Sequence, residues 1–152
     1  MIRYLTCLTL LVLLAVGAAL AGERDGAIEW RELDAALSES QTAGMPVMIH
    51  FTAEWCGWCK KMKKEVYGQA DVTATLNREF VPAMVDTDKR PDLKARYGVQ
   101  GLPTIWFLTS EGEGITYVPG YVDAPTFRQI LSWVSSGAYA TQSFEEFSGA
   151  GG

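Results

Sequence analysis

The order of the predicted elements indicates an α/β fold built on a mixed sheet of about four to five strands, with helices on both faces. Two observations lead to this prediction. Three short apolar segments alternate with segments of helical periodicity, an order typical of parallel strands joined by right-handed crossovers. A fourth strand-like segment follows the third after only a Ser-Glu-Gly-Glu-Gly turn, so the last two strands are expected to form an antiparallel hairpin.

One predicted helix and one predicted strand precede the Cys-Gly-Trp-Cys segment. Trp30, Leu33 and Leu37 fall on one face of a helix that extends to about Thr42. The sequence Ala-Gly-Met-Pro then ends this helix. The apolar run Val47–Phe51 is rich in strand formers, and it fits a buried central strand.

Two helical pieces separate this strand from the next. A helix that begins near Cys56 carries Cys59 and Met62 on its apolar face and four lysines on its other face. These lysines are interpreted as a solvated helix face. Gly68 ends or kinks the helix, and Asp71 is expected to cap the second piece.

The second half of the chain supplies the remaining elements. Phe80–Asp86 is predicted as the second strand, and residues 90–99 as a short helix that ends at a glycine. Pro103–Thr109 and residues 115–120 are the two strands of the hairpin. Asp123 is expected to cap the last helix, which carries an apolar stripe.

The first 21 residues have the layout of a secretory signal. Arg3 precedes an apolar run from Leu5 to Val16, and Ala19 and Ala21 form an A-x-A site that predicts cleavage after Ala21. The apolar run is also long enough for a marginal membrane span, so an uncleaved anchor is the alternative. In either case the rest of the chain is expected to be exported.

The remaining residues are expected to form one domain with short extensions. Residues 22–29 are predicted as a linker, residues 30–137 as the domain and residues 138–152 as a tail, in which Phe144 and Phe147 could pack as one helical turn. The chain has 18 acidic and 13 basic residues and a net charge of −5. Since phosphate backbones would repel this charge, nucleic acid is not an expected partner.

The cysteine pair admits three interpretations. Removal of the signal takes Cys7 with it and leaves Cys56 and Cys59 as the only two cysteines. A zinc site needs four ligands, or three and water, and the chain offers only His50 in addition, so no metal is expected. A structural disulfide over so short a loop would restrict the unfolded chain little. A redox pair is therefore the favoured interpretation.

The predicted positions of the two cysteines suggest different roles. A helix N-terminus stabilises a thiolate, so Cys56 is expected to have a lowered thiol pKa and to be the nucleophile. Cys59 lies one turn further along the apolar face, where it is shielded and can resolve a mixed disulfide with Cys56. Trp55 is expected to flank an exposed Cys56 sulfur.

Two separated segments resemble the thioredoxin superfamily. "FTAEWCGWCK" is similar to its active-site segment, and "YGVQGLPTIWFL" is similar to a later segment in which a proline beside the active site has a cis peptide bond. "PGYVD" before the last helix also fits. The resemblance covers about residues 30–136 and extends to exported thioredoxin-like proteins and to the C-terminal periplasmic domain of the thiol:disulfide interchange reductase.

This resemblance implies a thioredoxin-like three-layer sandwich and a site on which substrate binds. Cys56 would attack and Cys59 would resolve, while Pro103 would be cis and Leu102 would present its backbone to an extended substrate. The substrate-binding residues implied are Trp55, Gly57, Trp58, Leu102 and Pro103. The resemblance also implies a bacterial periplasmic location, a monomer and no cofactor.

The sequence departs from the family at three positions. His50 stands where the family usually has a buried acid that relays a proton to the resolving cysteine, and Met84 stands where thioredoxins have a lysine. Histidine titrates near neutral pH, so His50 is expected either to take over the relay, with an effect between about pH 6 and 8, or to be a core residue. Trp58 replaces the proline found between thioredoxin cysteines.

The predicted function is thiol–disulfide exchange on cysteine-containing exported proteins, most simply as a reductase supplied with electrons by a membrane-embedded thiol reductase. An oxidase or isomerase is the alternative within the same chemistry. A peptide-binding module without redox activity is the alternative from another class, although it would not need both cysteines.

Overall fold

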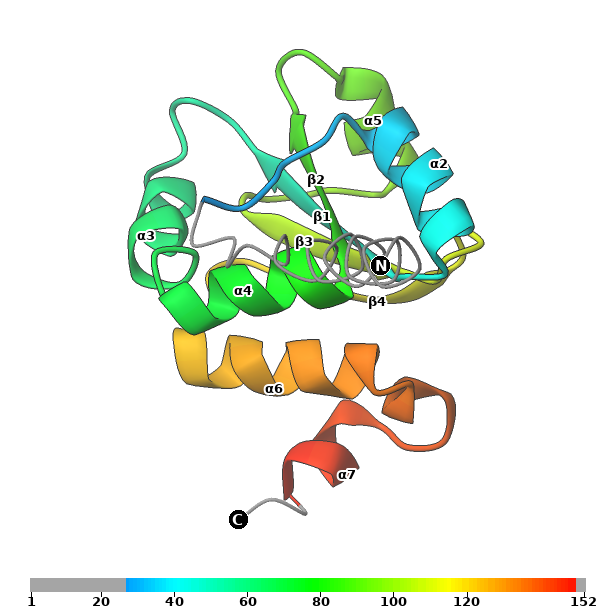
Figure 1. The fold of residues 1–152 in the computed structure, drawn as a ribbon. Coiled ribbons are helices and arrows are strands. Elements are labelled where there is room, and N and C mark those ends of the chain that lie inside the picture. The colour runs from blue at the N-terminus through cyan, green and yellow to red at the C-terminus, as the bar shows by residue number, and fades with distance from the viewer. Residues whose placement is uncertain (1–26, 150–152) are drawn as a thin grey trace, which may run out of the picture.

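The computed structural model describes residues 27–149, and a four-stranded mixed sheet forms its middle layer (Figure 1). The strands lie in the order β2-β1-β3-β4. Their bounds are β1 Val47–Thr52, β2 Val81–Asp86, β3 Thr104–Leu108 and β4 Gly114–Pro119. The helices are α2 Leu33–Ala43, α3 Gly57–Glu65, α4 Ala70–Glu79, α5 Pro91–Arg96, α6 Ala124–Ser135, the 3-10 helix η1 Ala138–Ala140 and α7 Phe144–Gly149.

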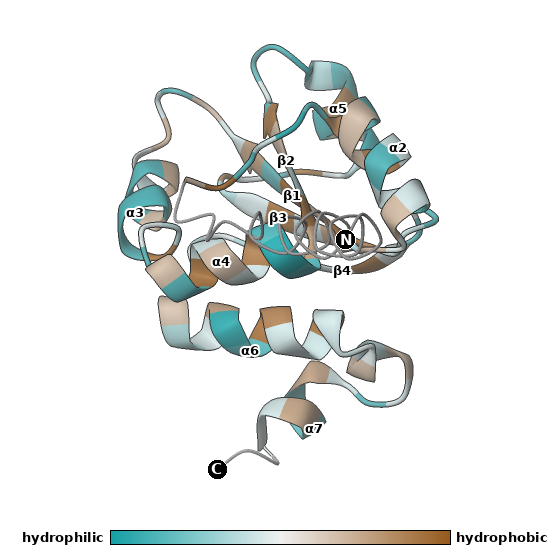
Figure 2. Cartoon of the chain, in the orientation of Figure 1, coloured by the Kyte–Doolittle hydropathy of each residue, from teal (hydrophilic) through white to brown (hydrophobic). Residues whose placement is uncertain are grey.

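Helices cover both faces of the sheet, as the predicted three-layer sandwich requires. Successive side chains of a strand point to opposite faces, and β1 supplies Met48 to one core and Ile49 to the other. The first core is closed by residues of α3, α4 and α6, and the second by residues of α2 and α5. Figure 2 shows that the outer face of α3 is largely hydrophilic, in line with its lysines.

The direction of β3 differs from the sequence prediction. β1 and β2 are parallel, as predicted, but β3 runs antiparallel to β1 and is not joined to β2 by a parallel crossover. The reason is the length of α5, whose six residues span only about 9 Å. A strand of six residues spans about 20 Å, so α5 cannot return the chain to the opposite end of the sheet. The chain therefore enters β3 at the end where it left β2.

Of the two predicted aspartate caps, one is present and the other is not. Asp123 caps α6 as predicted, because its carboxylate accepts a hydrogen bond from the Thr126 N–H at 3.0 Å. Asp71 does not cap α4, whose N-cap is Gln69. Asp71 lies instead in the first turn of α4, where it pairs with Arg128 of α6 and where a negative charge favours the helix dipole.

Both ends of the described chain pack onto the domain. Ile28 is buried in the first core, and Arg31 forms a parallel bridge with Ala83 of β2. At the other end, Phe144 packs against Trp133 with a ring-centroid distance of 5.7 Å, and the Trp133 Nε1–H donates to the Gln142 carbonyl at 3.0 Å. The predicted signal segment lies outside the described residues. Within residues 27–149 no helix combines the length and the apolar character needed to span a membrane.

Candidate functional site

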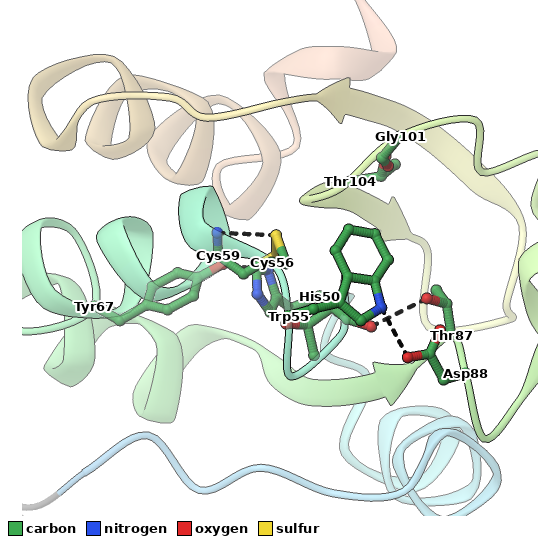
Figure 3. Close-up of a disulfide and its surroundings, with 10 residues drawn as sticks. His50, Trp55, Cys56, Cys59, Tyr67, Thr87, Asp88, Gly101 and Thr104 are labelled. Atoms are coloured by element: carbon green, nitrogen blue, oxygen red, sulfur yellow. Dashed lines mark hydrogen bonds between the residues drawn. A yellow bond between two sulfur atoms is a disulfide. The ribbon is translucent and has the colours of Figure 1, made fainter.

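The redox pair lies where the central strand passes into a helix. β1 is buried from Val47 to Phe51 and ends at Thr52. A turn closed by the Cys56 N–H donating to the Ala53 carbonyl at 3.1 Å then directs the chain into α3. Cys56 is the N-cap of α3, and its sulfur accepts a hydrogen bond from the Cys59 N–H at 3.1 Å (Figure 3). The cysteine therefore stands at the positive end of the helix dipole, as the sequence predicted.

Cys56 and Cys59 form a disulfide with an S–S distance of 2.07 Å. Both residues are buried, with 3% and 4% of their surface exposed, and they pack with Ala53 and Leu102. The expectation of an exposed Cys56 sulfur is wrong for the oxidised protein. The reason is that the disulfide holds the Cys56 sulfur toward Cys59 on the inner side of α3, where Leu102 covers it.

The segment before β3 faces this disulfide. The peptide bond between Leu102 and Pro103 is cis. The Pro103 carbonyl accepts a hydrogen bond from the Gly120 N–H at 2.7 Å, and the Thr104 hydroxyl donates to the Gly101 carbonyl at 2.7 Å. The N–H and C=O groups of Leu102 have no hydrogen-bond partner among residues 27–149. A free backbone donor and acceptor thus lie beside the redox pair.

Two exposed tryptophans flank the disulfide, and each is held by residues that the sequence did not indicate. Trp55 is 68% exposed, and its Nε1–H donates to the Asp88 carboxylate at 2.8 Å. Trp58 is 57% exposed and packs against Tyr121 at a centroid distance of 5.7 Å. Asp88 is 33 residues from its partner, and no local pattern relates them.

Lys61 joins Trp58 to Tyr121 and belongs to the lysine cluster interpreted from the sequence as solvated. Its ammonium lies 5.0 Å from the Trp58 ring centroid and 4.9 Å from that of Tyr121, both within range of a cation–π interaction. Glu65 completes the group, since it accepts a hydrogen bond from the Tyr121 hydroxyl at 2.8 Å and lies 3.9 Å from the Lys61 ammonium. The tryptophan between the cysteines is therefore fixed in place.

His50 is buried behind the redox pair, with 2% of its surface exposed. Its Nδ1 lies 3.0 Å from the hydroxyl of Tyr67, which is also buried (Figure 3). The Trp30 ring packs against the imidazole at a centroid distance of 5.9 Å. Met84 is the strand neighbour of His50 on β2, so the residue paired with it on that strand is uncharged. Tyr67 was not expected as a partner from the sequence, because 17 residues separate it from His50.

Burial determines the charge of this histidine. Loss of solvent lowers the pKa of His50 from 6.5 to about 4, and burial raises the pKa of Tyr67 above its usual value. The imidazole is therefore neutral at pH 7. The expected titration of His50 between pH 6 and 8 is wrong, because that expectation assumed solvent access.

A cavity of about 690 Å³ lies behind the disulfide, and His50, Cys59 and Tyr67 are among the residues that line it. This space, called the rear cavity below, also reaches the segment Ala27–Glu32 and the start of α5. Among residues 27–149 no group of three or more histidine, cysteine or acidic side chains is arranged to hold a metal ion.

The lowered pKa of His50 predicts a specific acid sensitivity of folding. As the pH falls from 6.5 to 4, the unfolded chain binds a proton at His50 before the folded protein does. The free energy of unfolding therefore falls, by up to about 3 kcal/mol for a shift of this size. His50→Gln should remove this part of the decrease. Urea unfolding of both proteins at pH 7, 5.5 and 4 measures it, and equal slopes with pH would contradict the assignment.

The chain is similar to several known proteins. The thioredoxin-like domain family matches residues 33–135. A thiol:disulfide interchange protein DsbD of Yersinia pestis is 36% identical over 105 residues, which make up 66% of this chain and 17% of that protein. A protein disulfide-isomerase of Hordeum vulgare is 35% identical over 78 residues, or 51% of this chain and 15% of that protein. The chain thus spans about a sixth of the length of these two relatives.

Solved structures agree with these matches. A thioredoxin from Thermus thermophilus superposes with a TM-score of 0.66 at 29% identity, and the match covers 72% of this chain and 88% of the thioredoxin. A structure described as DsbH oxidoreductase superposes with a TM-score of 0.62, covering 80% of this chain and 96% of its own, and its 24% identity supports the fold alone. The chain belongs to the thioredoxin-like domain family.

Proposed function

We propose that this protein is a thiol–disulfide oxidoreductase and that it works as a reductase of disulfides in exported proteins. The observation that carries the proposal is a Cys-x-x-C disulfide at the N-terminus of α3, beside the free backbone of Leu102 and in front of an uncharged histidine. A protonated His50 would stabilise a thiolate and make the pair more oxidising. A neutral imidazole lacks this effect, which favours a reducing pair.

The proposed reaction begins with the reduced protein. The Cys56 thiolate, stabilised by the dipole of α3 and by the Cys59 N–H, attacks one sulfur of a substrate disulfide. A mixed disulfide forms, and the first substrate thiolate leaves and takes up a proton. Cys59 then loses its proton and attacks the Cys56 sulfur, which releases the second substrate thiolate. Two electrons pass to the substrate, and the protein ends as the Cys56–Cys59 disulfide.

Substrate is proposed to bind across the Leu102–Pro103 segment as an extended strand. The unpaired N–H and C=O of Leu102 can each form a main-chain hydrogen bond with such a segment. Trp55 and Trp58 offer exposed aromatic surface on either side of the cysteines, with Gly57 leaving the space between them open. Binding through backbone groups and aromatic rings suits a protein with many different substrates.

His50 is proposed to assist the second step. It lines the rear cavity with Cys59, and Tyr67 fixes its ring through Nδ1. A neutral imidazole can accept the Cys59 proton while Cys59 attacks the mixed disulfide. Its low pKa makes it a weak base, so its contribution should lie at the lower end of the range for such catalysis.

The location and the partners follow from the same proposal. The signal-like segment 1–21 and the relatives named DsbD favour export to a bacterial periplasm. A reductase in an oxidising compartment needs a source of electrons, and a membrane-embedded thiol reductase is the proposed donor. The protein is proposed to act as a monomer and without a cofactor.

The two cysteines should differ in what their loss does. Cys56→Ser should abolish the acceleration of insulin reduction by dithiothreitol that the protein provides, and it should form no mixed disulfide. Cys59→Ser should also be inactive in turnover, but it should accumulate a mixed disulfide through Cys56, visible by non-reducing electrophoresis. Each variant is the control for the other. If Cys56→Ser accumulated the mixed disulfide and Cys59→Ser did not, the roles of attacking and resolving cysteine would be reversed. Full activity of Cys56→Ser would favour a binding module without redox activity.

His50→Gln should slow the second step more than the first. In a single turnover, the mixed disulfide between Cys56 and a thionitrobenzoate group should be resolved roughly a hundredfold more slowly, while its formation changes little. Since the pKa of His50 is about 4, the resolution rate of the unchanged protein should show no inflection from His50 between pH 6 and 8. Equal resolution rates in the two proteins would show that His50 is only a core residue.

A further inference from the structure

The rear cavity has the size of a ligand site, and the proposed exchange reaction leaves most of it unused. Its volume of about 690 Å³ falls within the range of roughly 300–1,000 Å³ typical of small-molecule sites. Substrate disulfides are proposed to approach Cys56 from the side of Leu102, whereas Cys59 and His50 contribute to the wall of the rear cavity. A ligand in the rear cavity would thus contact the redox pair from the side of Cys59, away from the proposed substrate site at Leu102.

Apolar and aromatic side chains form much of the wall of the rear cavity. Trp30 and Tyr67 meet edge to face at a centroid distance of 5.4 Å, and Met84 and Leu93 add aliphatic surface. Trp30 is held in place because its neighbour Arg31 bridges to β2. Such a wall suits a ligand with a flat apolar body, which can lie flat against one ring and meet the other at its edge.

The charges around the rear cavity favour an anion. Among residues 27–149, five basic and three acidic side chains line it. The basic residues Arg31, Lys89 and Arg90 form ion pairs with neighbouring carboxylates. By contrast, Lys60 and Lys63 of α3 form no ion pair with any residue between 27 and 149.

The acidic side chains of the wall do not cancel these two lysines. The Asp86 carboxylate forms an ion pair with the Lys89 ammonium at 3.4 Å, and the charge of Glu32 is attracted by that of Arg90. Among the described residues that line the cavity, Glu54 is therefore the one carboxylate left whose negative charge can offset the positive charges of Lys60 and Lys63. Two unpaired ammonium groups beside an apolar wall are complementary to a small anion with an apolar body.

We propose that the rear cavity binds a small organic anion whose flat apolar body lies against Trp30 and Tyr67 and whose charged group meets Lys60 and Lys63. The small volume and its partial enclosure by the segment Ala27–Glu32 favour a free small molecule over a segment of another protein.

Binding in the rear cavity should depend on the redox state of the cysteine pair, a consequence that rests on the proposed function. Reduction adds a thiolate at Cys56 and a thiol at Cys59, and the negative charge disfavours a nearby anion. The ligand should therefore bind the oxidised protein more tightly. By reciprocity it should lower the reduction potential, and a tenfold preference corresponds to about 30 mV.

Naphthalene-2-sulfonate is a suitable probe, with the uncharged naphthalene-2-sulfonamide as its matched control. Titration into the oxidised protein, followed by NMR, should give saturable shifts of the His50 ring and of the Cys59 amide with the sulfonate, and weaker binding of the sulfonamide. The double variant Lys60→Gln with Lys63→Gln should weaken sulfonate binding about fivefold to thirtyfold, as expected for two exposed charge contacts. Glu54→Gln should tighten it.

A matched double variant, Lys64→Gln with Lys94→Gln, removes the same charge from lysines that do not line the cavity, and it should leave the affinity within about twofold. The proposal is overturned by an absence of saturable shifts, by equal binding of the sulfonamide, or by an equal loss in the two double variants. Tighter binding of a flexible acidic hexapeptide than of the sulfonate would assign the cavity to a protein segment instead.

The redox coupling is tested separately, by comparing the dissociation constant for the sulfonate in oxidised protein with that in protein reduced by uncharged dithiothreitol. Equal constants would contradict the coupling. Insulin reduction without the sulfonate reports on the proposed function alone, so a failure of that function and a failure of the ligand site can be told apart.

Discussion

The arrangement of the site depends on the direct passage from β1, which is buried from Val47 to Phe51, into α3. β1 is fixed by β2 on one side and by β3 on the other, so its end has one position relative to the sheet. The short turn that follows leaves Cys56 at the N-cap of α3 and Cys59 one turn later on the buried side. Because β3 also borders β1, the Leu102–Pro103 segment before β3 meets the cysteines at the same end of the sheet. One central strand thus positions the nucleophile, the resolving cysteine and the Leu102–Pro103 segment, where substrate is proposed to bind.

The second constraint is the burial of an uncharged His50 behind the cysteines. His50 occupies β1 between Met84 and Ile105, and its only polar partner among residues 27–149 is the Tyr67 hydroxyl. A carboxylate at this position would carry a charge or a strongly raised pKa, whereas the buried imidazole stays neutral over the physiological range. The redox pair is therefore influenced mainly by the dipole of α3 and by the lysines of that helix. This is the physical basis for proposing a reducing pair.

Features that depend on neighbours in the sequence could be predicted, and those that depend on distant contacts could not. The cysteine pair, the buried strand before it and the Asp123 cap of α6 are local patterns, and the structure contains all three. The direction of β3 depended on the length of α5, which periodicity defines poorly. The contacts of His50 with Tyr67 and of Trp55 with Asp88 join residues 17 and 33 positions apart, and no spacing rule connects them. The sequence left two roles open for His50 for the same reason, since its charge follows from burial in the folded protein.

The reduction potential of the Cys56–Cys59 pair tests the central claim most directly. It is measured by equilibrating the protein with mixtures of reduced and oxidised glutathione at pH 7 and quantifying the two redox forms. A helix N-terminus without a buried positive charge behind the pair predicts a reducing value, between about −270 and −200 mV, the range of thioredoxin and the glutaredoxins. A value near about −120 mV, as found for strongly oxidising disulfide donors, would contradict the proposed reductase and assign the protein to disulfide formation.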